Sequence, residues 1–265
     1  MQETLEMVGG GRLGDFLHQL YIPKIFYLQR GIKTNLCISD NFGDSFSSGA
    51  QQTYEELKKI IYKQNFINSF KVNEYSENAI NLSSWRSSPL LYNFGWTDIL
   101  INTFMPQSLK YTNLKILTLD SEYYDNNFEG CLIANRSLDC RRYSSNNEIP
   151  MEIIKKFPKN KRFFVCNKSD FLSYESYPFK QYFNFMCVDN LNDFFKIINS
   201  CELYMGNLTG ITAIAYALKK NMLCEFGSVD SKSYSEEIKY NSNISYYNNV
   251  GLYANNYIKN KLEIK

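Results

Sequence analysis

Short apolar runs alternate with polar, glycine-containing turns along much of the chain, and this pattern predicts α/β structure. Near the amino terminus an apolar run at residues 5–8 ends in Gly9-Gly10-Gly11, and residues 15–29 then carry apolar side chains at helical spacing. The order predicts a strand, a glycine turn and a helix, with Pro23 kinking or restarting the helix. A second apolar run at residues 35–39 predicts a strand that completes a β-α-β unit.

The remainder of the first half carries the signals of a second such unit. The sequence Thr53-Tyr54-Glu55-Glu56 predicts a capping box that opens a helix. Strands are expected at residues 66–72 and 79–82, a buried aromatic-rich helix at 90–104, and a crossing segment at 115–119.

A polar, turn-rich stretch at residues 123–130 predicts a linker between two domains, which we place at 1–122 and 123–265. In the second half strands and helices alternate, with strands expected at 131–134, 162–166, 202–205 and 222–226 and helices beginning at 190 and 209. The tyrosine- and asparagine-rich tail from residue 242 is expected to form a helix and to pack back toward the first domain.

The composition restricts the class of ligand. Hydrophobic residues make up 44% of the chain, which is ample for packed cores, and 29 Lys and Arg against 27 Asp and Glu give a net charge of +2. Because no strong basic field is available to hold a nucleic acid backbone, a nucleic acid partner is not expected. The ligand should be small and recognised locally.

The cysteines and the amino terminus indicate a cellular compartment. The seven cysteines are scattered, odd in number and never form a Cys-x-x-Cys pair, so they predict neither a disulfide framework nor a zinc site. The first residues lack the basic region and apolar core of a signal peptide, and no apolar run is long enough to span a bilayer. We therefore expect a cytoplasmic protein without a transmembrane segment.

The glycine turn near the amino terminus is the first candidate for chemistry, because open α/β sheets bind ligands at the carboxyl ends of their strands. Gly11, Arg12 and Gly14 would let the backbone approach a ligand closely. Asp15 falls at the expected helix start with His18 one turn later on the same face, so Asp15 is a candidate catalytic base supported by His18. Alternatively Asp15 only caps the helix, and the single histidine is structural.

The second candidate is the turn before the helix at 209, where small and hydroxyl residues meet a helix amino terminus that favours an anion such as a diphosphate. Its residues are Asn207, Leu208, Thr209, Gly210, Ile211 and Thr212. Asn135, Arg136 and Ser137 follow the strand at 131–134, and the guanidinium fork of Arg136 suits phosphate oxygens. Glu225, at the end of the next strand, is a weaker candidate for the ribose hydroxyls. A plain helix cap by Thr209 is the alternative.

Two motifs carry a resemblance to a known family. Gly14-Asp15-Phe16-Leu17-His18 resembles the Gly-Asp-x-x-His signature of ADP-heptose:lipopolysaccharide heptosyltransferases. The segment 201–218 is similar to that family's carboxyl-terminal strand, Gly-x-x-[ST]-Gly turn and alanine-rich helix. The resemblance implies a GT-B-like α/β fold, in which two Rossmann-like domains face each other across a cleft. The acceptor would bind domain 1–122 and the nucleotide-sugar donor domain 123–265.

The resemblance also implies a reaction class, which is the inverting transfer of a sugar from a nucleoside diphosphate to a hydroxyl of a glycan acceptor. It assigns Asp15 as the general base and residues 208–212 to the donor phosphates, and it leaves the sugar open. The chain has no Asp-x-Asp motif, which argues against a metal-dependent transferase. We expect no cofactor beyond the donor, with the helix dipole and Arg136 in place of a metal.

Two alternatives belong to other functional classes. Residues 9–14 superficially resemble the glycine-rich loop of an S-adenosylmethionine-dependent methyltransferase, and Asp40 could then hold the ribose. That interpretation leaves the Gly206 turn unexplained. A non-catalytic sugar-binding module would keep the same fold, although Asp15 in its glycine turn favours an enzyme.

Overall fold

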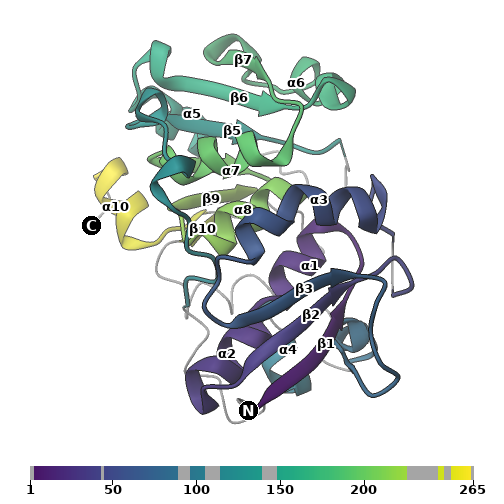
Figure 1. The fold of residues 1–265 in the computed structure, drawn as a ribbon. Helices are drawn as coiled ribbons and strands as arrows, with labels where there is room; N and C mark the ends of the chain where they lie inside the picture. Colours follow the sequence, from purple (N-terminus) through teal and green to yellow (C-terminus); the bar gives the residue numbers. More distant parts are fainter. Residues whose placement is uncertain are drawn as a thin grey trace. The chain divides into compact units, whose positions relative to one another are not determined.

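The computed structural model describes residues 3–42, 45–88, 96–104, 114–138, 148–225, 244–247 and 252–263. The chain forms two compact units, Met1–Leu119 and Asp120–Lys265, each with its own sheet (Figure 1). The predicted boundary lies between residues 122 and 123. The segment at 115–119, expected to be a crossing segment, is bound to the first unit. The Lys24 ammonium donates to the Ile116 carbonyl at 3.3 Å, and the Thr118 N–H donates to Gln64 at 3.0 Å.

The first unit has a parallel four-stranded sheet in the order β3-β2-β1-β4. Its elements are β1 (Thr4–Gly9), α1 (Leu13–Gln19), α2 (Tyr21–Arg30), β2 (Lys33–Ile38), α3 (Gly49–Ile61), β3 (Ile67–Val72), β4 (Ile80–Asn81), the 3₁₀ helix η1 (Leu82–Ser87) and α4 (Trp96–Phe104). Because β1 lies between β2 and β4, the chain leaves β1 toward one side and returns to its other side through β4. The sheet therefore has a topological switch point between β1 and β4.

Most predicted elements of this unit are present. The strands at 5–8, 35–39, 66–72 and 79–82 correspond to β1, β2, β3 and β4. The first helix restarts as predicted: α1 ends at Gln19 and α2 begins at Tyr21. Pro23 lies in the first turn of α2, where backbone N–H groups have no partner within the helix, so the N–H that proline lacks is not needed there. Of the helix expected at 90–104, the part that lies within the described residues is α4.

The capping box predicted at Thr53 is wrong. Helix α3 already begins at Gly49, and the Thr53 hydroxyl donates to the Gly49 carbonyl inside the helix at 2.9 Å. The start of the helix is served by Asp40, whose carboxylate accepts the Ala50 N–H at 2.7 Å and the Phe46 N–H at 3.2 Å. A Thr-x-x-Glu pattern also fits a helix interior, because a threonine hydroxyl there can bond back to a carbonyl one turn earlier.

The second unit has a seven-stranded sheet in the order β11-β10-β9-β8-β5-β6-β7, parallel except for β11. Its strands and α-helices are β5 (Leu132–Asn135), α5 (Glu148–Lys155), β6 (Arg162–Cys166), α6 (Phe171–Glu175), β7 (Asn184–Cys187), α7 (Leu191–Ser200), β8 (Leu203–Gly206), α8 (Gly210–Ala217), β9 (Met222–Glu225), β10 (Ile244–Tyr247), β11 (Leu252–Tyr253) and α10 (Asn256–Leu262). The chain proceeds from β5 to β6 and β7 on one side and then to β8, β9 and β10 on the other. Its switch point lies between β5 and β8.

The carboxyl-terminal tail contains the predicted helix as α10, but two strands that were not predicted precede it. β10 pairs with β9 (Figure 1), and β11 pairs with β10, so both strands extend the second sheet. Packing of the tail toward the first domain stays a prediction. Ile258 of α10 is buried in the core of the second unit, and the Tyr257 hydroxyl donates to Glu202 at 2.6 Å. The sequence Ile244-Ser-Tyr-Tyr247 contains β-branched and aromatic residues, which favour a strand beside an already formed sheet.

Within the described ranges, no helix combines the length and the apolar character that spanning a membrane requires.

Candidate active site

Each unit places polar residues at the switch point of its sheet, where open parallel sheets bind ligands. In the first unit these residues follow β1 and β4. In the second unit they follow β5 and β8 and include the last residue of β9.

The glycine turn after β1 is held by a residue that the sequence did not reveal. Gln19 is fully buried; its side-chain carbonyl accepts the Gly10 N–H at 3.2 Å, and its amide donates to the Gly10 carbonyl at 3.0 Å. The same amide lies 3.3 Å from the Ser83 hydroxyl on η1. Gln19 therefore joins the glycine turn, helix α1 and the 3₁₀ helix after β4.

Asp15 lies in the first turn of α1 and is tied to two donors. Its Oδ2 accepts the Arg12 N–H at 3.1 Å, so the carboxylate does serve the helix start. The same oxygen accepts Nη2 of Arg86 at 2.5 Å. The Asp15 and Arg86 side chains keep 18% and 30% of their surface exposed, so a ligand can reach the pair. Arg86 could not be recognised from the sequence, because it lies 71 positions away on η1.

Gly11 makes this ion pair possible. Its φ of +94° lies in the left-handed region, and a β-carbon built there would stand 2.6 Å from Nη2 of Arg86 and 3.0 Å from Oδ2 of Asp15. Any side chain would therefore displace the guanidinium. We expected the glycine turn to leave space for a ligand. At Gly11 that space is occupied by the Arg86 guanidinium.

His18 is half-buried one turn after Asp15. Burial lowers the pKa of its imidazole to about 4, so the ring is neutral near pH 7. A neutral imidazole can exchange hydrogen bonds with a ligand or a neighbour, but it supplies no positive charge to the Asp15 carboxylate.

In the second unit, the loop after β5 is locked to the turn after β8. Gly206 pairs with Asn135, and a β-carbon on Gly206 would stand 2.2 Å from the Asn135 carbonyl, so only glycine fits. The fully buried Asn207 side chain accepts the Ser137 N–H at 2.8 Å and donates to the Ser137 carbonyl at 3.2 Å. The predicted residues Ser137 and Asn207 thus bind each other, and the neighbouring Asn135 side chain donates to the Val165 carbonyl at 2.8 Å.

The hydroxyls of the same turn are also engaged internally. Thr209 caps α8: its hydroxyl accepts the Thr212 N–H at 3.1 Å and donates to the Asn135 side chain at 3.0 Å. The Thr212 hydroxyl bonds the Asn207 carbonyl and lies 2.8 Å from the Tyr204 hydroxyl. The groups best placed for an anion are the N–H groups of Gly210 and Ile211, because the first turn of a helix has no intrahelical acceptors for them. Leu208 and Ile211 are partly exposed beside them.

Arg136 and Glu225 meet, but they bind each other. Nε and Nη2 of Arg136 donate to the two carboxylate oxygens of Glu225 at 2.9 and 3.0 Å, and the side chains are only 10% and 6% exposed. The guanidinium also lies over the Tyr177 ring at 5.6 Å. Burial, reinforced by the Glu225 carboxylate, raises the pKa of Tyr177, so it stays a neutral phenol. The phosphate role predicted for Arg136 and the ribose role predicted for Glu225 would both have to operate beside this internal ion pair.

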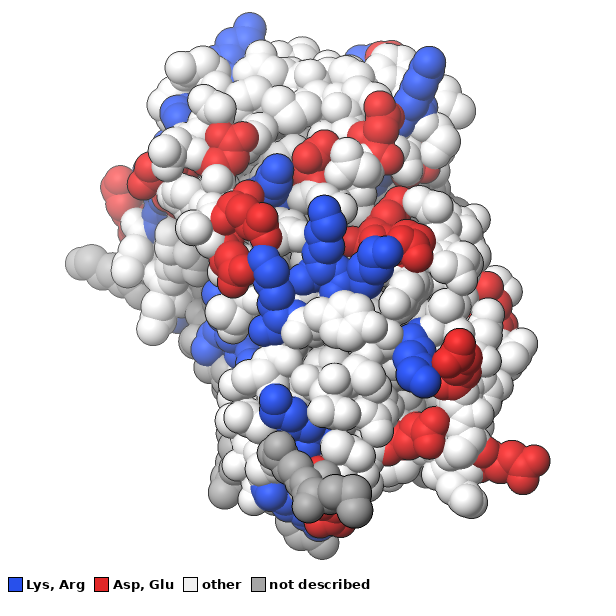
Figure 2. Space-filling view, viewed as in Figure 1, with Lys and Arg blue, Asp and Glu red and all other residues white. Residues whose placement is uncertain are grey.

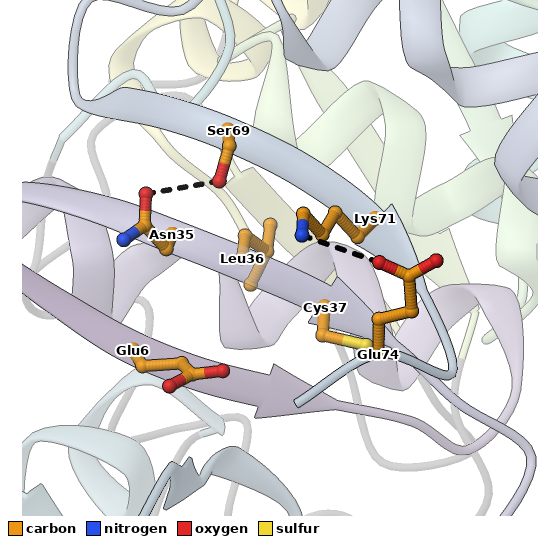
Figure 3. A pocket seen from close by; sticks show the side chains of 7 residues that line it. All are labelled: Glu6, Asn35, Leu36, Cys37, Ser69, Lys71 and Glu74. Carbon is orange, nitrogen blue, oxygen red and sulfur yellow. Dashed lines mark hydrogen bonds and ion pairs between the residues drawn. The ribbon is translucent and has the colours of Figure 1, made fainter. Parts of the chain in front are cut away.

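A hollow of about 180 Å³ opens on the face of the first sheet, between β1, β2 and β3 (Figure 3). Its side chains pair among themselves: Lys71 donates to Glu74 at 3.2 Å, and Ser69 donates to Asn35 at 2.9 Å. Burial raises the pKa of the Cys37 thiol, which disfavours a reactive thiolate. We do not place the active site here, because the hollow lies on the face of the sheet and not at its switch point, and its lining cation, Lys71, is already paired with Glu74.

The described residues contain no cluster of metal ligands, and the face drawn in Figure 2 has a mixed charge. Among the described residues, His, Cys, Asp and Glu nowhere gather in a group of three that could hold a metal ion. On the face drawn in Figure 2, acidic and basic side chains are interspersed, in keeping with the small net charge of +2.

No protein-family model and no curated protein matches the sequence. Several solved structures match the fold. A glycosyl transferase of family 9 from Veillonella parvula is 10% identical with a TM-score of 0.57, over 94% of this chain and 88% of that one. Escherichia coli ADP-heptose lipopolysaccharide heptosyltransferase II is 9% identical with a TM-score of 0.57, over 92% and 90% of the two chains. Escherichia coli heptosyltransferase WaaC, solved with ADP, is 9% identical with a TM-score of 0.54, over 92% and 93%.

Because the identities are only 9–10%, these matches establish the fold alone. The chain has a GT-B-like α/β fold built from two Rossmann-like units, as the motifs predicted. The heptosyltransferases that the two motifs resemble are among the proteins that share it.

Proposed function

We propose that this protein is a glycosyltransferase that moves a sugar from a nucleoside-diphosphate sugar to a hydroxyl of a glycan acceptor. The observation that carries the proposal is the partly exposed Asp15 carboxylate, which lies at the carboxyl end of β1 and at the switch point of its sheet. The fold shared with heptosyltransferases, one of them solved with ADP, supports the reaction class.

Asp15 acts as the general base. Its carboxylate takes the proton of the acceptor hydroxyl while that oxygen attacks the anomeric carbon of the donor. The bond from the anomeric carbon to the phosphate oxygen breaks at the same time, and the nucleoside diphosphate leaves with the bonding electrons. Attack opposite the leaving group inverts the anomeric centre. His18, neutral near pH 7, contributes a hydrogen bond to Asp15 or to the acceptor.

The donor diphosphate binds the amino terminus of α8. The N–H groups of Gly210 and Ile211 and the helix dipole stabilise the charge that develops on the leaving diphosphate. Arg136 adds positive potential, which its ion pair with Glu225 partly offsets. Because a helix terminus supplies the stabilisation and the chain lacks an Asp-x-Asp motif, we propose that transfer needs no metal.

The contacts of two residues count against the methyltransferase alternative. Asp40, its candidate ribose ligand, accepts two N–H groups at the start of α3. Both backbone polar groups of Gly10 are bonded to Gln19, which leaves this part of the loop less able to receive a cofactor.

The test is a transfer assay on Asp15→Asn. Asparagine keeps the shape and an oxygen that can accept the Arg12 N–H, but it has no basicity. Turnover should fall about a hundredfold or more while donor affinity, measured by calorimetry, stays nearly unchanged. A suitable donor is found first by screening nucleoside diphosphates and nucleotide sugars for an increase in Tm.

Two outcomes would contradict the proposal. Transfer by Asp15→Asn at the wild-type rate would remove Asp15 as the base. Donor binding by the wild-type protein without transfer or donor hydrolysis would favour the non-catalytic sugar-binding module.

A further inference from the structure

We propose that Arg86 is a positioning residue for Asp15: it holds the carboxylate in its reactive orientation and keeps it ionised between turnovers. This inference rests on the proposed role of Asp15 as the base. It adds a residue from a different part of the chain to the catalytic apparatus of the first unit.

The ion pair is produced by the sheet. Pairing of β1 with β4 aligns Val8 with Asn81, so the turn after β1 and the 3₁₀ helix after β4 start side by side. Asp15 enters from the first and Arg86 from the second, and they meet at 2.5 Å. The space for the guanidinium exists because Gly11 has no side chain.

The 3₁₀ helix that carries Arg86 is held in place by contacts that do not involve Asp15. Asn81 caps η1 by accepting the Ser83 N–H at 2.9 Å, and Ser83 also contacts the buried Gln19 amide at 3.3 Å. The Arg86 guanidinium lies over the neighbouring Trp85 ring at 5.0 Å. These contacts fix the backbone of Arg86 with respect to α1, so its side chain presents a charge to Asp15 from a rigid support.

The guanidinium has an incomplete set of partners in the described structure. Its Nε is buried and lacks a hydrogen-bond acceptor there, while Nη2 binds Asp15. A buried N–H without an acceptor costs free energy. The contact with the Asp15 carboxylate is therefore the polar interaction that stabilises the guanidinium in this position.

The charge of Arg86 bears on the reaction because only an ionised carboxylate can take the acceptor proton. A cation in contact with a carboxylate favours its charged form, so the base remains available at lower pH. Two titratable residues lie close to Asp15 in the sequence, Arg12 at the N-cap of α1 and His18 within α1. Arg12 contacts the carboxylate through its backbone N–H, and His18 is neutral near pH 7. Arg86 contacts Asp15 directly with its guanidinium.

The experiment compares Arg86→Gln, Arg86→Lys and Asp15→Asn, the double variant Asp15→Asn with Arg86→Gln, and Arg30→Gln as a control. Arg30 is an exposed arginine at the end of α2, and its guanidinium lies over the Phe26 ring at 5.6 Å. All variants are first checked for wild-type cooperative thermal unfolding, and Arg86→Lys keeps the test usable where glutamine disturbs folding.

Arg86→Gln should lower kcat about tenfold, with the donor KM within about twofold of wild type. The acid limb of its pH–rate profile should move to higher pH by about one unit, because the carboxylate loses its cation. Arg86→Lys should restore part of both effects, and Arg30→Gln should show neither. In the Asp15→Asn background, Arg86→Gln should have no further effect on kcat, since it acts through Asp15.

A loss of activity equal at every pH, or a further loss in the double variant, would overturn the inference in favour of a structural role or a direct contact with substrate. A ¹³C titration of the Asp15 carboxyl, identified by its absence from Asp15→Asn, follows the pair without turnover. If the titration midpoint of Asp15 lies at higher pH in Arg86→Gln than in the wild type, the result supports the ion pair. If no donor is transferred in that case, only the proposed function fails. A midpoint that does not move overturns the inference whatever the activity.

Discussion

At the scale of single residues, the site of the first unit depends on the space that Gly11 leaves open. Gly11 leaves room for Arg86, and without that room Asp15 would keep only its role at the start of α1. The alternative raised from the sequence, that Asp15 caps the helix, is therefore not exclusive of a catalytic role. One carboxylate oxygen receives the Arg12 N–H as well as the Arg86 guanidinium.

We predict that Gly11→Ala destabilises the protein more than Gly31→Ala. Both glycines have positive φ, +94° and +69°, so both alanines are strained by about 1 kcal/mol. A β-carbon at Gly31 meets nothing within 4 Å, whereas one at Gly11 collides with Arg86. Urea unfolding should show an additional loss of about 1–2 kcal/mol for Gly11→Ala. Equal losses for the two variants would mean that the guanidinium moves aside without cost.

At the scale of elements, the turn after β8 shows that capping and ligand binding use different groups of one helix terminus. The hydroxyls of Thr209 and Thr212 and the amide of Asn207 bind protein groups and fix the turn against the loop after β5. The backbone N–H groups of the first turn of α8 point out of the helix end and remain the natural site for an anion.

We predict that Gly210→Pro weakens nucleoside diphosphate binding by about tenfold or more, whereas Gly210→Ala changes it little. Proline removes the first N–H of α8 and is tolerated at this helix position. The preceding Thr209 has φ −128° and ψ 171°, the extended conformation that a following proline requires. Loss of one hydrogen bond to a charged group corresponds to about 1.5–3 kcal/mol. Calorimetry on both variants measures the effect, and unchanged affinity in Gly210→Pro would place the diphosphate elsewhere.

At the scale of the whole molecule, the chain is two structural units with separate sheets and separate cores. The segment 115–119 belongs to the first unit through its bonds to Lys24 and Gln64. The tail completes the second unit by adding β10 and β11 to its sheet and Ile258 to its core. All contacts proposed for the donor therefore come from residues 120–265.

We predict that residues 120–265, expressed alone, unfold cooperatively in urea and bind the same nucleoside diphosphate as the full chain, within about threefold in Kd. EDTA should leave the affinity of both unchanged, because a helix terminus rather than a metal is proposed to hold the phosphates. A fragment that folds but does not bind would show that the first unit contributes donor contacts. Affinity lost on adding EDTA would contradict the metal-independent proposal.

The sequence by itself determined the local features of this protein. The strands at 162–166 and 222–226, the helix that begins after Asn190, and the restart at Pro23 all follow from periodicity, caps and proline geometry within a few residues. The glycine turn and Asp15 could be singled out in the same way, because strand, turn and helix are adjacent in the chain. The Thr53 error has the same origin, since a local pattern compatible with two positions in a helix cannot choose between them.

Only the tertiary structure decided which polar side chains meet. Arg86 reaches Asp15 across 71 positions and Arg136 reaches Glu225 across 89, because strand pairing brings the carboxyl ends of β1 and β4, and of β5, β8 and β9, to common edges. The strands of the tail likewise form because β9 offers an edge to pair with. Hydrophobic periodicity records which face of an element is buried, but it carries no information about the partner that covers that face or pairs with its charges.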